Sequence, residues 1–219
     1  MAIIQSGSGA DLLRVDTTNK AARVAIYPRQ FYGSYHFSAN SGIIAASTAA
    51  DSILFTLKNT STNLFLIKRI LVGMQVTTAY TKGSVRLGAF IVRTNYTAQG
   101  TTAATTVVLT GNNGKKRTSY PSPTINVQIC TTTTISGENV GANEDTTPFA
   151  QALIDLRADI GTSPVAGLVP LYDELVMESP FILEANEGIR IKNRTVFPAT
   201  GSGHLIVDVD YDEVPTADI

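Results

Sequence analysis

Apolar residues in this chain recur mostly at every second position, and this spacing constrains the fold more than any other feature of the sequence. A period of two is typical of β-strands, whose side chains alternate between two faces. The segment 204–212 shows it most regularly, with an apolar row of Leu205, Val207, Val209 and Tyr211. The segment 64–76 carries large apolar side chains on both faces: Leu64, Leu66, Ile70 and Val72 on one, Phe65, Ile67 and Leu71 on the other. A strand of this second kind belongs in a core or at a subunit interface, so we expect the chain to form an oligomer.

Segments with strand-like composition follow one another along the chain, separated by residues typical of turns. We expect strands at 21–27, 33–38, 42–46, 52–58, 64–76, 84–96, 106–110, 124–131, 172–177, 180–184, 188–194 and 204–212. No regular alternation with helices occurs, so the pattern predicts an all-β antiparallel sandwich or jelly roll. We expect residues 1–219 to form a single domain of this kind. It would have an extended N-terminal segment, a C-terminal strand and long surface loops at 97–106 and 131–147.

One segment also allows a helix. Thr147 and Pro148 resemble an N-cap and a first helical residue. The apolar residues that follow at helical spacing are Phe149, Leu153, Leu156 and Ile160. The same segment also alternates as a strand, so both interpretations stay open. The fold therefore contains at most one short helix.

Two pairs of neighbouring strands carry the signals of β-hairpins. The segments 52–58 and 64–76 flank a short polar connection, and 188–194 would pair with 204–212 near the C-terminus. The second hairpin would set a basic row opposite an acidic row: Arg190, Lys192 and Arg194 opposite Asp208, Asp210 and Asp212. We favour this charge ladder over a calcium site, because alternate carboxylates of a strand lie about 7 Å apart. No glycine follows them for the sharp turn of a calcium loop either.

Charge and histidine content restrict the classes of function. Charged residues make up 16% of the chain and the net charge is −1, so no overall charge attracts nucleic acid or an anionic membrane. We expect no transmembrane helix and no secretory signal. Cys130 is the single cysteine, and His36 and His204 are the only histidines. We therefore expect no disulfide, no metal or cofactor site and no catalytic residues, with structural roles for both histidines.

A tight turn followed by three cations is the one motif with a functional interpretation. Gly111 and Gly114 bracket the turn, and Lys115, Lys116 and Arg117 follow it. The segment is not a phosphate-binding loop, because it lacks the first glycine of that motif. It is either a solvated hairpin tip or an electrostatic contact with an acidic partner surface, and the three cations are our candidate partner-contact residues.

Several strings of the sequence together resemble a loosely defined family of tailed-bacteriophage virion proteins. These strings are Val15–Thr18 with Lys20–Arg23, Leu109–Lys115, Asn186–Gly188 and Val207–Val214. The resemblance implies a jelly-roll head decoration (cement) protein, often a homotrimer, that binds the major capsid protein on the capsid exterior. It carries no catalytic residues across to this chain, so we expect no enzyme. Such a virion assembles in the host cytoplasm, which agrees with a single free cysteine.

Two other classes of function stay open. A tail or fibre module that binds a host receptor, such as a carbohydrate, would use exposed aromatic side chains. The candidates for that role are Tyr27, Tyr32, Tyr35 and Phe37. A β-sandwich glycan hydrolase would need two carboxylates that the fold brings together from distant parts of the chain.

Overall fold

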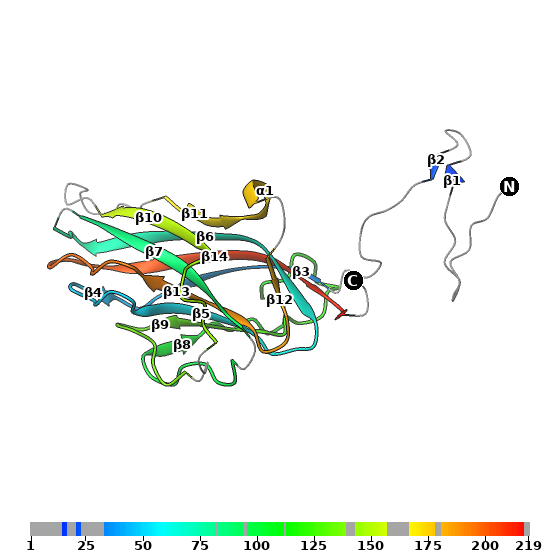
Figure 1. Ribbon diagram of the computed structural model, residues 1–219, viewed down its shortest axis with the longest axis horizontal. Helices are drawn as coiled ribbons and strands as arrows, with labels where there is room; N and C mark the ends of the chain where they lie inside the picture. The colour runs from blue at the N-terminus through cyan, green and yellow to red at the C-terminus, as the bar shows by residue number, and fades with distance from the viewer. Residues whose placement is uncertain are drawn as a thin grey trace.

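The computed structural model of the chain is nearly all β-strand and consists mainly of two antiparallel sheets packed together (Figure 1). It describes residues 15–16, 21–22, 33–81, 83–93, 96–111, 113–138, 143–156, 167–177 and 181–216. The predicted all-β sandwich is therefore confirmed. The strand expected at 21–27 lies mostly outside the described residues. Its described part is β2 (Ala21–Ala22), which pairs with β1 (Val15–Asp16) in a two-stranded sheet.

Each of the two main sheets has its own set of strands. The first sheet has the order β10 (Ala150–Leu156), β7 (Gly83–Val92), β13 (Gly188–Asn193), β5 (Ile53–Asn59), β9 (Ile125–Cys130) and β8 (Ala104–Thr106). The second has the order β11 (Val169–Asp173), β6 (Leu64–Thr78), β14 (Ser202–Val214) and β3 (Gly33–Asn40). Beside this path, β12 (Phe181–Leu183) pairs with β6, and β4 (Ile44–Ala45) pairs with β14. The short helix α1 (Glu174–Met177) directly follows β11.

The core lies between the two sheets and uses the alternation of apolar residues. The predicted inward row of β14 is fully buried: Leu205, Val207, Val209 and Tyr211. The ring of Tyr211 stacks on Tyr35 of β3 with 5.2 Å between the ring centroids. Phe37 of β3 stacks on Phe55 of β5 at 6.4 Å and so joins the second sheet to the first. Offset ring contacts of this kind add to the stability that burial of the rings supplies.

The hairpin predicted for 52–58 and 64–76 does not form. β5 pairs with β13 and β9 in the first sheet, whereas β6 pairs with β14 in the second, so the loop between them crosses from one sheet to the other. Asn59 holds this crossing, because its buried amide donates to the carbonyl oxygens of Asn63 and Leu183 at 2.7 and 3.2 Å. A short polar loop joins strands equally well within one sheet or between two, so the local pattern does not distinguish these arrangements.

The predicted C-terminal hairpin and its charge ladder are also wrong. β13 lies in the first sheet and β14 in the second, and the connection between them crosses the sandwich. Ile189 and Ile191 of β13 point into the core, as do Val207 and Val209 of β14. The charged residues that alternate with them consequently lie on opposite outer faces of the sandwich and cannot pair with one another.

A bulge in β6 changes which of its residues face the core. Asp210 and Tyr211 of β14 lie opposite Arg69 and Ile67, so Lys68 is an extra residue without a partner in the ladder. The fully buried row of β6 is Phe65, Ile67, Ile70, Val72 and Met74. The predicted division of this strand into two faces is wrong because the inward row changes parity at the bulge. The outer face carries the half-buried side chains of Leu64, Leu66 and Leu71.

The segment that allowed both a helix and a strand is the strand β10, so the helical interpretation is wrong. It pairs with β7 along its whole length. Its buried residues alternate with exposed ones, and Leu153, which a helix would have buried, is 61% exposed. The helix instead ends the segment 172–177, which we expected to be a strand throughout. The short strand expected at 106–110 is displaced to β8.

We predict that Val207→Asp lowers the free energy of unfolding by several kcal/mol, because it places an unpaired charge in the core. Gln75→Asp is the control, since Gln75 is exposed on β6 and a surface change usually costs less than about 0.5 kcal/mol. Urea denaturation of both variants measures the difference. Equal losses would contradict the inward row of β14.

Candidate functional site

The basic turn that we predicted as a partner contact lies along β3, the outermost strand of the second sheet. Gly114 has a φ of 77° and its carbonyl oxygen accepts a backbone hydrogen bond from β3 at 2.7 Å. The backbone N–H of Lys116 donates to the carbonyl oxygen of Ser34 at 3.0 Å. The turn therefore continues the sheet by a short distance. The side chain of Lys115 is half-buried, whereas those of Lys116 and Arg117 are exposed.

Lys116 does not stand alone in solvent, because its ammonium binds Asp210 of β14. The distance from Lys116 Nζ to Asp210 Oδ1 is 3.0 Å, and His36 Nδ1 lies 3.2 Å from the same oxygen. Arg69 donates to Asp210 Oδ2 from Nε at 3.0 Å and from its terminal nitrogen at 2.5 Å. Arg69 lies opposite Asp210 in the ladder, directly beside the bulge in β6. One carboxylate thus connects β6, β14, β3 and the basic turn.

Two outward acids of β14, Asp210 and Asp212, are paired with cations on this face. Burial raises the pKa of Asp210, but the hydrogen bonds and charges of Lys116 and Arg69 outweigh it and hold the pKa below its ordinary value of 3.8. Asp212 lies two residues further on and is 3% exposed, with its Oδ2 at 2.5 Å from Lys68 Nζ. Asp210 therefore stays ionised, and the two carboxylates hold Arg69 and Lys68 of β6 on this face.

An open hollow of about 210 Å³ lies beside Asp210 on the same face. Its lining consists of Lys68, Arg69, Lys116, Asp173, Glu174, Leu175 and Asp210. α1 forms part of its rim. The pairing of β11 with β6 ends at Asp173, opposite Arg69, and the pairing of β12 with β6 begins at Phe181, opposite Ile67. The excursion of the chain through α1 thus occurs at the same point of β6 as the bulge.

α1 presents two apolar side chains to solvent at the rim of this hollow. Leu175 is 86% exposed and Val176 is 76% exposed, the highest values among the large apolar residues of the described chain. The helix starts at Asp173, whose Oδ1 accepts the backbone N–H of Leu175 at 3.0 Å as an N-cap. Exposed apolar groups beside charged residues are typical of a protein-binding surface.

The hollow combines both signs of charge. Lys68, Arg69 and Lys116 face Asp173, Glu174 and Asp210, so the lining has no net formal charge. A surface of this kind recognises the charge pattern of another protein. It is less suited to a polyanion, which needs an excess of cations.

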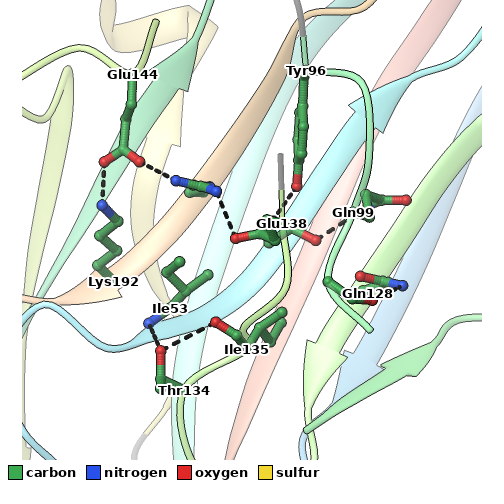
Figure 2. Close-up of polar contacts among 12 residues, drawn as sticks. Ile53, Tyr96, Gln99, Gln128, Thr134, Ile135, Glu138, Glu144 and Lys192 are labelled. Atoms are coloured by element: carbon green, nitrogen blue, oxygen red, sulfur yellow. Dashed lines mark hydrogen bonds and ion pairs between the residues drawn. The ribbon is translucent and has the colours of Figure 1, made fainter. Parts of the chain in front are cut away.

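A second group of charged residues is buried beneath the segments 96–103 and 131–147 (Figure 2). We expected surface loops at 97–106 and 131–147, and apart from Gly100 and Ile135 their described residues are exposed or half-buried, although 104–106 is the strand β8. Some of their side chains nevertheless pack on the outer face of the first sheet. Tyr96 is fully buried and Ile135 is 1% exposed. The loops also bind each other, since the N–H of Thr101 donates to the carbonyl oxygen of Ser136 at 3.0 Å. The sandwich therefore has an additional layer on this side.

Arg190 of β13 is the centre of the buried group. One terminal nitrogen of Arg190 lies 2.7 Å from Glu138 Oε2, and the other binds Glu144. Lys192 also binds Glu144, and the hydroxyl of Tyr96 donates to Glu138. Figure 2 shows these contacts joining the loops to β13. The side chains of Arg190 and Glu138 are only 7% and 3% exposed, so the ion pair is protected from solvent.

The ring of Tyr96 covers the Arg190 guanidinium, with 5.8 Å between them. This close packing requires a glycine at the start of β13, because a Cβ on Gly188 would lie 2.6 Å from the Tyr96 ring. Burial raises the pKa of Glu138 above its ordinary value of 4.5, although the Tyr96 hydroxyl and Arg190 oppose the shift. Burial lowers the pKa of Arg190, but the attraction of Glu138 outweighs it and keeps the guanidinium charged.

Glu213 is a further buried carboxyl group, at the end of the inward row of β14. Its two oxygens accept the backbone N–H and the hydroxyl of Thr124 at 2.8 and 3.0 Å. Thr124 directly precedes β9, so this contact joins the second sheet to the first. Burial raises the pKa of Glu213, and the hydrogen bonds from Thr124 only partly oppose it.

The other residues singled out from the sequence lie apart from the hollow or in the core. His204 Nδ1 lies 2.8 Å from the carbonyl oxygen of Ser41, six residues and about 20 Å along β14 from the position of Asp210. Tyr35 and Phe37 are core residues, and Tyr27 and Tyr32 lie outside the described residues. Two of the four candidate stacking residues are therefore inaccessible.

Among the residues that the structure describes, no three or more His, Cys, Asp or Glu side chains are grouped as metal ligands would be. No helix in the described part of the chain is long and apolar enough to cross a bilayer. Cys130 is a free, buried thiol, and burial raises its pKa to about 12.

No protein-family model matches the chain, and no curated protein is similar to it in sequence.

Sequence reasoning singled out one lining residue of the hollow, Lys116, as a candidate partner contact, which stays a prediction, and it did not predict α1. The signal for α1 was present, because Asp173 followed by Glu174 is a typical start of a helix. We interpreted the segment as a strand, since its apolar residues continue those of β11. The bulge beside Arg69 has no comparable signal in the sequence.

We predict that Arg190→Met lowers the free energy of unfolding by about 3–5 kcal/mol, because it removes the cation from the buried Glu138 and leaves Glu144 paired with Lys192. Arg194→Met is the matched control. Arg194 is 35% exposed and pairs with an exposed carboxylate, so the loss should stay below about 1 kcal/mol. Urea denaturation measures both, and similar losses would contradict a structural role for the buried group.

A second prediction concerns the pH dependence of stability. Because the fold raises the pKa of Glu213, the folded chain binds this proton more tightly than the unfolded chain does. Its contribution is fully present below about 4.5 and is lost as the pH rises through the folded pKa. Glu213→Gln should therefore reduce the fall in unfolding free energy between pH 4.5 and neutrality. Denaturation at several pH values tests this, with the exposed Glu184→Gln as control; an unchanged pH profile in Glu213→Gln would refute it.

Proposed function

We propose that this chain is a structural protein of a tailed-phage virion, a decoration or cement protein that binds the outside of the head shell and stabilises it. Its action would be binding alone, without a reaction. The resemblance of several strings to such proteins motivates the proposal, and the trimer and the jelly-roll connectivity are part of it.

The observation that carries the proposal is the use of both long loops as a packed layer. In a binding or catalytic sandwich, long loops commonly form the rim of an accessible site. Here the described parts of the two loops are fixed on the first sheet by the Arg190 ion pairs and by Tyr96. Lys58 Nζ adds a further tie, since it donates to the carbonyl oxygen of Thr97 at 3.0 Å. A rigid block of this kind suits a protein whose task is to hold others in place.

The contact surface would be the face that carries the hollow, where apolar and charged side chains are exposed together. The proposal that Lys115, Lys116 and Arg117 contact an acidic partner is retained, but Lys116 now shares its charge with Asp210. Exposed Arg117 would therefore supply most of the attraction.

Particles with and without this chain provide the test. We expect the purified chain to bind the head exterior of particles that lack it and to raise the temperature at which those particles release their genome. Electron cryomicroscopy of the decorated particles should show a density of this size on the shell. Density only at the tail, or an unchanged release temperature with no binding, would overturn the proposal, and the first result would favour a tail module.

A further inference from the structure

Four of the exposed large apolar side chains of the described chain lie between positions 168 and 182, beside the second sheet. Leu175 and Val176 of α1 are the most exposed, and Leu168 and Ile182 on either side are 38% and 44% exposed. The described parts of this segment on either side of α1 lie beside β6, since β11 and β12 both pair with that strand. A soluble chain seldom leaves such a cluster in contact with water unless a partner covers it.

The shape of this region pairs a projection with a depression. We call the exposed pair Leu175 and Val176 the knob, and the space lined by Lys68, Arg69, Lys116, Asp173, Glu174, Leu175 and Asp210 the hollow. Leu175 belongs to both, so the knob stands at the rim of the hollow. A surface with a knob beside a hollow can fit a copy of itself.

The charges of the region are also self-complementary. Asp173 and Glu174 stand beside the knob, while Lys116 lies in the wall of the hollow and Arg117 follows it in the chain. When the knob of one copy enters the hollow of the next, its acidic residues approach the basic turn of that copy. The hollow itself has no net formal charge, so two copies do not repel one another.

We propose that the partner of this surface is a second copy of the chain, with the knob of one copy seated in the hollow of the next. The inference deepens the proposed function, because it names the surface through which the proposed oligomer forms. The contact would close either as a reciprocal pair or head-to-tail as a ring of three, the trimer that the resemblance implies. The acidic partner surface expected for the basic turn would then be Asp173 and Glu174 of the neighbouring copy.

Sedimentation velocity of the full chain at micromolar concentration tests the knob. We expect the parent to sediment as a pair or a ring of three, and the double variant Leu175→Glu/Val176→Glu to sediment as a 23.3 kDa monomer. Both side chains are more than three-quarters exposed, so urea denaturation should show unchanged stability in the variant. Val196→Glu is the control, since Val196 is 56% exposed in the connection before β14 and should leave the association intact.

A charge exchange tests the orientation of the contact. Glu174→Lys and Arg117→Glu should each raise the dissociation constant about tenfold, and the two changes combined in one chain should restore it. Rescue by the combination distinguishes a direct contact from a general effect of net charge. Additive weakening in the double variant would overturn this pairing of acidic and basic residues.

Two results would overturn the whole inference: a monomeric parent, or an oligomeric parent whose association survives the loss of the knob. Both are measured without particles, so they leave the proposed virion function to its own test. Conversely, a chain that associates through the knob but does not bind a head shell would refute the virion proposal alone.

Discussion

The antiparallel pairing of β6 with β14 is the constraint on which the rest of the structure depends. It joins nearly the whole of both strands, from Leu64 to Thr78 on one and from Ser202 to Val214 on the other. The inward rows of the two strands form one wall of the core, and their outward residues form the floor of the hollow. Because the side chains of a strand alternate between its two faces, the register of this ladder determines which residues line the core and which form the floor of the hollow.

The ion pairs on the two outer faces of the sandwich differ in their exposure to solvent. On the first sheet, the loops exclude solvent from Arg190 and its carboxylates, and the group holds the additional layer in place. A buried ion pair of this kind adds little net stability, because desolvation offsets much of the attraction, but the loss of one partner is costly. On the second sheet, the pairs around Asp210 remain partly exposed, with Arg69 46% and Lys116 43% accessible. That face keeps charge available to another molecule.

Sequence reasoning predicted correctly which face of a strand is buried, where this depends on that strand alone. It failed to predict which strands pair with each other. The alternation in 204–212 identified the buried row of β14, because that row depends only on the strand itself. Both predicted hairpins failed, because a short polar loop has the same composition whether it turns within a sheet or crosses between sheets. The Arg190 group was equally invisible, since Glu138 and Glu144 lie far from β13 in the sequence and in a stretch that resembled a solvated loop. Lys116 was singled out as a candidate contact because three adjacent cations after a glycine turn form a purely local signal.

The bulge in β6 divides the strand into two parts whose inward rows are out of phase. Because Lys68 is the extra residue, a strand without it would keep Phe65, Ile67 and Ile70 on the core side in strict alternation. A gain or loss of one residue elsewhere in β6 would turn part of its apolar row outward. Position 68 is therefore where the length of this strand can vary between versions of the chain while the core stays the same. Such a change would leave the apolar core in place, but it would remove Lys68 from the buried Asp212 and reshape the floor beside α1.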